Sequence, residues 1–390
     1  MTLSELLAGR AAAAADAPAM TWTAPAVTVT WAELDRRGTA VAAALRRVTE
    51  PRQRAAILIE PSPDYVVAFL GALRAGLVAI PAGPDRRASV LADAEPSIVL
   101  ATAATVPAIR RLLATLDTCG HRVLAVDGVP DAPGFTSYPA VPDDIAYLQY
   151  PRGVMVTHAN VVANARQAAQ VLGRTAVVSL PPSDPLGLVL GVAVPIVTGR
   201  AVVNDAAAPE ALPGCYVVAE ATALVACGRP VGQQVAIVDR EGRRGAVGEI
   251  WVSGPNVARG YWRRPEESAR IFCARIVGDD EPRWWLRTGD QGFLDASGEL
   301  CVTGRSFVAG HRPEDLEATA EQAHPAIRPR AASAFAVSGG QAVVVLELAD
   351  GVIPPRGEVE RAVRHAVSTR HGLTLRRVVV LQSSIGDGLW

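Results

Sequence analysis

The sequence predicts an α/β protein with two domains, and three observations support this prediction. The chain has 390 residues, which exceeds the length at which one hydrophobic core usually stops growing. Hydrophobic residues make up 49% of it and aromatic residues only 5%, a composition that suits a soluble α/β protein better than an all-β one. Strand-like and helix-like segments also alternate through its first part, which indicates a largely parallel sheet covered by helices.

The alternation begins near residue 27. Residues 27–30 are Val-Thr-Val-Thr, as in a strand, apolar residues then recur at helical spacing, and Thr30 is placed to cap the helix. Further elements are predicted in the order strand 54–60, helix 63–76, strand 78–83, helix 87–94 and strand 97–102. The apolar run over 65–83 carries Arg74 and ends in Pro and Gly, so it predicts a buried helix and strand rather than a membrane span.

The segment 147–173 predicts a strand, a turn, a second strand and a helix. Its turn consists only of Pro151, Arg152 and Gly153. Proline donates no backbone N–H, and Pro-Arg-Gly is well suited to closing a tight hairpin. We therefore expect a structural turn, with a phosphate contact by Arg152 as the alternative.

The pattern changes after Gly228. Short alternating strands with turns over 231–254 and 284–304 predict an antiparallel, barrel-like segment. Beyond it we expect a helix over 313–323, a strand over 340–349, a helix over 357–372 and a last strand over 376–382. The predicted domains are therefore a large one over 1–304 and a small α+β one over 305–390.

Charge and cysteine content narrow the possible partners and the compartment. The formal net charge is −1 and the arginines are scattered, so we expect neither a nucleic-acid partner nor binding to anionic lipid. The five cysteines are widely spaced without a CxxC pair, so neither a disulfide framework nor a zinc site is predicted. The first residues do not resemble a signal peptide. We expect a cytoplasmic protein with small-molecule or protein partners.

A series of short motifs follows one order along the chain. They are DIAYLQY (144–150), GVMVTHANVVANAR (153–166), LPPSDPLGL (180–188), YVVAEAT (216–222), CGRPVGQQVAIVD (227–239), VGEIWVSGPNVARGYWRRPEES (247–268), WLRTGD (285–290), LCVTGR (300–305) and EDLEATAEQAHPAIRP (314–329). Each motif alone is weak, but their joint order resembles the adenylate-forming ligases, specifically the fatty-acyl-AMP ligases.

This resemblance implies a fold, a reaction and a set of ligands. The family combines a large N-terminal domain with a mobile C-terminal lid. Its members join a carboxylate to the α-phosphate of ATP, release pyrophosphate and pass the acyl group to a carrier-protein thiol. The implied ligands are AMP or ATP with Mg and an acyl small molecule, and the implied partner is an acyl-carrier protein in lipid or polyketide biosynthesis.

The resemblance also implies a nucleotide site made of Tyr216, Glu220, Thr222, Asp290 and Arg305. Glu220 matches the carboxylate associated with magnesium, and it is the one weak candidate for a catalytic residue. Asp290 matches the carboxylate that accepts hydrogen bonds from the ribose hydroxyls, and Arg305 matches an arginine that faces ribose or phosphate.

Each of these residues also has a purely structural interpretation. Glu220 could be an ordinary helix-cap or surface acid. Asp290 could stabilise its Thr-Gly-Asp turn through an Asx-type bond to the backbone. Arg305 could be a solvated turn residue.

Three departures from the family oppose ATP-driven adenylation. Members carry a Thr-Ser-Gly-Ser-Thr-Gly-x-Pro-Lys-Gly loop, whose backbone N–H groups cradle phosphates, where this chain has only Pro-Arg-Gly. A short connector near 205–211 replaces the segments that line the acyl channel and contact the adenine. The family also uses a C-terminal lysine to compensate charge during adenylation, and this sequence contains no lysine.

Smaller departures alter the surroundings of the implied site. Val217 replaces a glycine and is expected to crowd the nucleotide. Asp184 to Leu188 lack the family's histidine, and residues 306–309 replace its hinge sequence. His158 lies at a predicted helix start, where we expect a capping or packing residue rather than a base.

Three functions follow from these matches and departures. The leading hypothesis is a pseudoenzyme that binds an acyl group, a nucleotide or a carrier protein. An active acyl-AMP ligase is the second, supported by Glu220, Asp290 and Arg305. The third is an enzyme that transfers acyl groups, or catalyses another reaction in its remodelled pocket, without ATP.

Overall fold

The computed structural model describes most of the chain as two compact units. By their contacts these are Met1–Thr288 with Phe293–Cys301, and Gly289–Gly292 with Val302–Trp390. The described residues are 1–83, 87–116, 122–172, 176–209, 212, 215–239, 241–279, 281–304, 311, 313–337, 341–349, 354–355 and 357–381.

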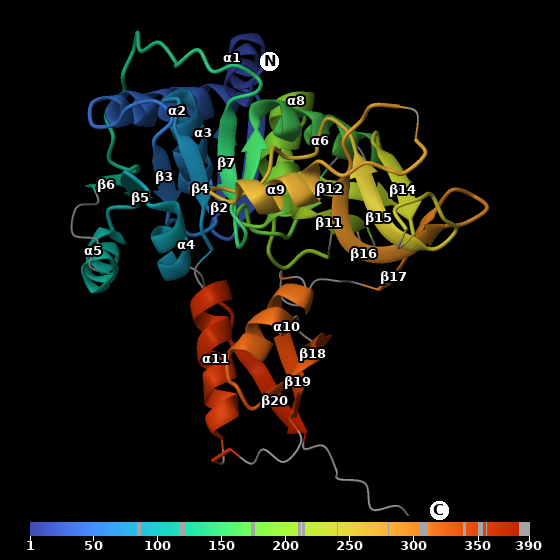
Figure 1. The fold of residues 1–390 in the computed structure, drawn as a ribbon. Coiled ribbons are helices and arrows are strands. Elements are labelled where there is room, and N and C mark those ends of the chain that lie inside the picture. The colour runs from blue at the N-terminus through green and yellow to red at the C-terminus, as the bar shows by residue number, and fades with distance from the viewer. Residues whose placement is uncertain are drawn as a thin grey trace, which may run out of the picture. The chain divides into compact units, whose positions relative to one another are not determined.

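The first unit contains a six-stranded sheet with the order β6-β5-β3-β4-β7-β8, and β3 to β7 are labelled in Figure 1. Its strands are β3 (Arg54–Ile57), β4 (Val78–Pro81), β5 (Ile98–Ala101), β6 (Arg122–Ala125), β7 (Ile145–Gln149) and β8 (Val154–Thr157). All neighbours pair in parallel except β7 and β8. The predicted parallel sheet is therefore confirmed.

Helices cover this sheet. They are α3 (Pro63–Arg74), α4 (Arg87–Ala94), α5 (Val106–Thr115) and α6 (His158–Val171), and α2 (Trp31–Arg46) packs on α3. Every side chain of α3 from Tyr65 to Arg74 is buried, and α3 packs on β3 and β4 (Figure 1). The predicted buried helix followed by a strand is thus confirmed. Among the described residues, none of the helices combines the length and apolar character that a bilayer crossing requires.

A second sheet of the first unit has the order β2-β1-β10-β9. Its strands are β1 (Pro18–Thr23), β2 (Ala26–Thr30), β9 (Ala176–Val178) and β10 (Val202–Asn204). The strand predicted before Thr30 is therefore present, but it lies outside the six-stranded sheet and pairs antiparallel with β1. Thr30 caps α2 as expected, since its hydroxyl accepts the N–H of Glu33 at 3.2 Å.

Further helices pack between and beside the sheets. They are α1 (Leu3–Ala13), α7 (Pro185–Leu188), the π-helix η2 (Val189–Ala193), α8 (Val194–Thr198) and α9 (Pro265–Phe272). Asp184 caps α7, because one of its carboxylate oxygens accepts the N–H groups of Leu186 at 2.8 Å and Gly187 at 3.1 Å.

Short strands dominate after residue 215, and those beyond Gly228 are the ones that the sequence predicts. Two sheets have the orders β11-β12-β13 and β14-β15-β16-β17, and β14 pairs antiparallel with β15. The strands are β11 (Tyr216–Val218), β12 (Ala223–Cys227), β13 (Arg229–Pro230), β14 (Gln234–Val238), β15 (Gly248–Ser253), β16 (Leu286–Leu294) and β17 (Leu300–Gly304).

The second unit has its own sheet, β18-β19-β20, and its own hydrophobic core. Its elements are α10 (Pro313–Gln322), β18 (Ile327–Val337), β19 (Gln341–Leu348), α11 (Glu358–His371) and β20 (Leu375–Leu381). Helix α10 packs on β18 and β19, and α11 on β20 (Figure 1). The predicted helices and the two predicted strands are present, whereas β18 was not expected.

Candidate functional site

The turn between β7 and β8 is the first component of the site. Gln149 pairs with Val154 across the hairpin, so four residues, Tyr150 to Gly153, make the connection. Gly153 has a φ of +67°, which favours glycine, and its carbonyl accepts the N–H of Trp262 at 2.8 Å. The predicted tight hairpin is confirmed. Only three of its four connecting residues carry a backbone N–H, because Pro151 has none.

Arg152 projects from this turn into the protein and is only 6% exposed. One guanidinium nitrogen lies 2.6 Å from Oε1 of Glu267, and the other lies 3.9 Å from Oε1 of Glu220. The guanidinium also stacks over the ring of Tyr261, 4.7 Å from its centroid. Burial opposes the charge, but Tyr261, Glu220 and Glu267 together raise the pKa of Arg152. The side chain is therefore a buried, permanently charged cation.

Glu220 approaches Arg152 from a second turn. It lies in the 3-10 helix η3 (Ala219–Ala221) between β11 and β12 and is 6% exposed. Its Oε1 accepts the hydroxyl proton of Tyr261 at 2.8 Å. Burial and the nearby Glu220 carboxylate raise the pKa of Tyr261, so the phenol keeps its proton and remains a donor.

Helix α9 provides the remaining member of this cluster. Glu267 lies in its first turn, where a negative charge is favoured by the helix dipole. We use "the Arg152 cluster" for Arg152, Glu220, Tyr261 and Glu267. These residues come from three separate segments of the first unit, and the sequence analysis did not group them. The available signal was the Gly-Tyr-Trp-Arg-Arg-Pro-Glu-Glu-Ser run, which places Tyr261 and Glu267 six residues apart.

The backbone beside Glu220 adopts a conformation that is unusual for its residues. Thr222 has φ +53° and Ala223 φ +94°, in the left-handed region that favours glycine. The Thr222 hydroxyl donates to the carbonyl of Asn256 at 2.6 Å, and this bond helps to hold the turn. Strained backbone of this kind often accompanies functional sites.

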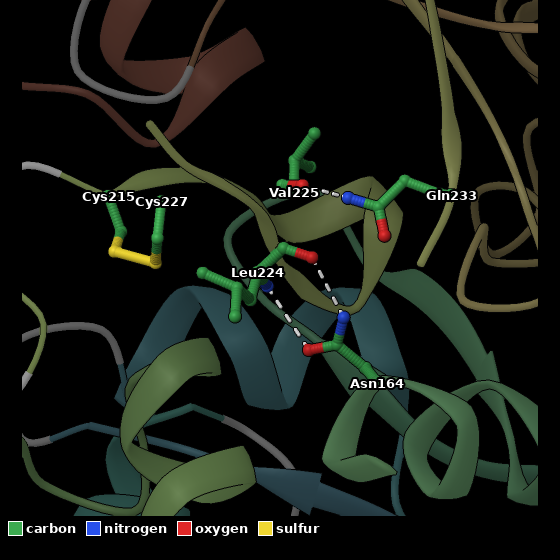
Figure 2. Close-up of a disulfide and its surroundings, with 6 residues drawn as sticks. All are labelled: Asn164, Cys215, Leu224, Val225, Cys227 and Gln233. Carbon is green, nitrogen blue, oxygen red and sulfur yellow. Dashed lines mark hydrogen bonds between the residues drawn. A yellow bond between two sulfur atoms is a disulfide. The ribbon is translucent and has the colours of Figure 1, made fainter. Parts of the chain in front are cut away.

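A buried asparagine and a disulfide hold the same hairpin (Figure 2). Asn164 of α6 donates to the carbonyl of Leu224 at 2.8 Å and accepts the Leu224 N–H at 3.1 Å. Cys215 and Cys227 are joined, with Cα atoms 4.3 Å apart. The expectation that the cysteines carry no disulfide is therefore wrong. The hairpin, and not the sequence spacing, brings the two together, because Tyr216 pairs with Ala226.

The structure brings three of the five predicted nucleotide-site residues into one hairpin. Tyr216 starts β11 and is buried, and Glu220 and Thr222 follow at its tip. Asp290 lies buried in β16, in a segment that belongs by its contacts to the second unit. Arg305 lies outside the described residues, as does the predicted hinge substitution at 306–309. Their joint role as a nucleotide site stays a prediction.

His158, at the start of α6, is not placed to act as a catalytic base. Its ring is buried, and burial lowers its pKa to about 4. A base with that pKa is weak at neutral pH. The side chain is therefore a neutral packing residue, in agreement with the structural expectation.

A magnesium ion does not fit beside Glu220 in this arrangement. The Arg152 guanidinium already provides the positive charge there, and one carboxylate oxygen accepts the Tyr261 proton. Magnesium requires near-octahedral oxygen ligands. Across the described part of the chain, no three His, Cys, Asp or Glu side chains gather closely enough to hold a metal ion.

Comparisons with known proteins agree on one family. The sequence pattern of the family described as AMP-binding enzyme matches residues 7–212 and 207–262. The long-chain-fatty-acid–AMP ligase FadD32 of Mycolicibacterium smegmatis is 28% identical over 537 residues, covering 90% of this chain and 85% of the relative. A putative fatty-acid–CoA ligase, fadD25 of Mycobacterium tuberculosis, is 29% identical over 527 residues, covering 92% and 89%.

A solved structure shares the fold. The fatty acid AMP ligase from Legionella pneumophila superposes with a TM-score of 0.71 and 22% identity, covering 100% of this chain and 93% of that one. The alignments with the two mycobacterial relatives extend over more residues than this chain contains. Those relatives therefore hold segments that are absent here.

Proposed function

The chain belongs to the AMP-binding enzyme family, and from this premise we propose that it is a fatty-acyl-AMP ligase homologue that does not adenylate. In this proposal it binds an acyl group, a nucleotide or an acyl-carrier protein in lipid or polyketide biosynthesis. Residues 1–304 form the ligand-binding domain and residues 305–390 a lid-like domain. Tyr216, Glu220, Thr222, Asp290 and Arg305 are the proposed nucleotide contacts.

One observation carries this proposal. The turn that precedes β8 has only four residues, and its single charged side chain is buried against Glu220 and Glu267. Triphosphate binding needs several backbone N–H groups aimed at the phosphates. A hairpin turn cannot supply them, since Pro151 has no N–H and Gly153 continues directly into β8. Without that cradle, ATP loses the positioning on which phosphoryl chemistry depends.

The competing functions are an active ligase and an enzyme that uses a preformed acyl-AMP or thioester. Two observations favour them. The named ligases match about nine-tenths of the chain, and Glu220 and Asp290 are both present and buried. Acyl transfer requires neither a triphosphate cradle nor an adenylating lysine, so it is compatible with the short turn.

Product formation separates these functions. The protein is incubated with Mg-ATP and fatty acids of mixed chain length, and mass spectrometry is used to search for acyl-AMP and pyrophosphate. FadD32 serves as the positive control and Asp290→Ala as the negative one. We expect no acyl-AMP from the protein, shown to be folded by circular dichroism. Product that disappears in Asp290→Ala would overturn the proposal.

Binding is tested separately with AMP and with a non-hydrolysable acyl-AMP mimic. A ligand that binds the folded state raises its Tm by mass action. If the nucleotide site persists, Tm rises with either ligand and the rise is lost in Asp290→Ala. A flat response to both ligands, combined with saturable binding of a carrier domain, would assign the protein to carrier recognition alone.

A further inference from the structure

The Arg152 cluster is a cation site whose cation is part of the chain. Two carboxylates, from Glu220 and Glu267, converge on one guanidinium, and the Tyr261 hydroxyl supports Glu220 from the side. Glu220 and Arg152 are both buried. A buried carboxylate is costly unless a cation or strong donors compensate it, so the fold requires a positive charge at this point.

We infer that Arg152 is the resident cation of a two-carboxylate site, and that its guanidinium excludes an external cation from Glu220 and Glu267. This inference deepens the proposed function, because it names the group that occupies the place beside the one predicted metal-associated carboxylate. The ligand class of the site is thus a small cation, and stacking on the Tyr261 ring favours a planar guanidinium over a divalent metal ion. The wild-type protein supplies that cation itself.

Three features distinguish Arg152, as the fixed cation of this site, from an arginine in an ordinary surface ion pair. The side chain of Arg152 is 7% exposed, whereas that of Arg263, which pairs with Glu95 in the same unit, is 52% exposed. Arg152 contacts two carboxylates and stacks on an aromatic face, an arrangement that suits a guanidinium better than an ammonium. The turn that carries it is also fixed, because Gly153 bonds to Trp262.

The test removes the resident cation and offers external ones. Arg152→Ala is purified and its Tm is measured with methylguanidinium, with Mg2+ or Mn2+, and with NaCl at matched ionic strength. We expect Arg152→Ala to have a lowered Tm that methylguanidinium or a divalent ion largely restores. Recovery with methylguanidinium alone identifies a guanidinium site, and recovery with the divalent ions identifies a latent metal site. The wild type should respond to none of them beyond NaCl.

Two control variants make the result specific. Arg152→Ala combined with Glu220→Gln should show no rescue, because the buried one of the two carboxylates, which most needs a cation, is gone. Arg263→Ala should change the Tm little and respond to no cation, since exposed pairs contribute little stability. If Arg152→Ala does not fold, Arg152→Gln, which retains more of the side-chain volume, is tested in the same way.

Two outcomes would overturn the inference. One is Mn2+ binding by the wild type, detected by electron paramagnetic resonance and abolished in Glu220→Gln. The other is an Arg152 variant that folds, loses stability and is rescued by none of the cations. Neither measurement uses ATP or an acyl chain. Suppose that the wild type makes acyl-AMP and that Mg2+ does not change its Tm. This result would refute the proposed function and leave the inference about Arg152 intact.

Discussion

Two short turns of the first unit meet at one ion pair. They differ in how closely each matches the pattern of the family and in the charge that each provides. The β7–β8 turn is short compared with the loop that the family resemblance implies, and it provides a buried cation, Arg152. The β11–β12 turn matches the family motif and provides a buried anion, Glu220, on a strained backbone. The comparison teaches that two turns distant in sequence can each bury a charge, because each supplies the counter-charge that the other needs.

The energetics of the pair make this comparison testable. Bringing two charges out of water is costly, and their attraction repays the cost only when both are present. Removing one partner leaves an uncompensated buried charge, whereas removing both leaves none. The two turns should therefore depend on each other more strongly than two unrelated surface loops.

The largest expected effect comes from breaking the pair on one side. Arg152→Met should lower the free energy of unfolding by about 3–5 kcal/mol, since Glu220 and Glu267 lose their cation. The double variant Arg152→Met with Glu220→Gln should be more stable than Arg152→Met alone. Urea denaturation measures both. Strictly additive losses would show that the turns act independently and would remove the basis of the comparison.

The β7–β8 side carries a second buried group, His158, and its effect depends on pH. Burial lowers its folded-state pKa from 6.5 to about 4, so the unfolded chain binds the extra proton first. The contribution of neutral His158 to the free energy of unfolding is therefore fully present above about pH 6.5. It is lost as the pH falls toward 4, and the total loss is roughly 3 kcal/mol. His158→Gln should remove this part of the acid sensitivity, as measured by urea denaturation at several pH values. An unchanged pH profile in the variant would contradict the lowered pKa.

The β11–β12 side depends on an amide that reaches it from α6. Asn164→Ala should lower the free energy of unfolding by about 1–3 kcal/mol, because the buried N–H and carbonyl of Leu224 lose their side-chain partner. Thr21→Ala, which removes an exposed Thr–Thr bond, is the matched control and should cost little. Hydrogen exchange of the Leu224 amide should accelerate in Asn164→Ala. Unaltered exchange would show that the hairpin holds itself.

The smallest expected change in stability comes from relieving the strained backbone of the β11–β12 turn. Ala223→Gly should raise stability by up to about 1 kcal/mol, because glycine adopts a φ of +94° without steric cost. Ala221→Gly, two residues earlier and outside the residues with positive φ, should lower stability by about 0.5–1 kcal/mol. Thermal unfolding of the two variants gives the signs. A loss of stability in both would mean that the backbone at Ala223 is not strained.

Local pattern was sufficient to predict much of the fold. The strands over 54–60 and 78–83 and the helix between them follow from apolar periodicity and from Pro and Gly at their ends. The pattern did not reveal β18 (Ile327–Val337), because the segment contains Pro329 and a run of alanines and lacks the alternation typical of a strand. It also could not assign β2 to its sheet, since sheet membership depends on partners distant in sequence.

The candidate site was predicted less completely for the same reason. Turn chemistry correctly predicted the hairpin at Pro151–Gly153, but turn residues are usually exposed, so nothing suggested that Arg152 is buried. Glu267 lies 115 positions further along the chain, beyond the range of any local rule. The disulfide was missed because the 12-residue separation of Cys215 and Cys227 has meaning only after β11 and β12 have paired.

The burial of Arg152 limits how the sequence of the β7–β8 turn can change. A longer turn that moved Arg152 away would leave Glu220 and Glu267 without their cation. A substitution of Arg152 would cause the same deficit with the short turn still in place. Either change alone, or both together, therefore leaves two carboxylates without a cation and should destabilise the protein. A longer β7–β8 turn is tolerated only if another positive charge reaches Glu220 and Glu267, so the short turn restricts which sequences this fold can accept.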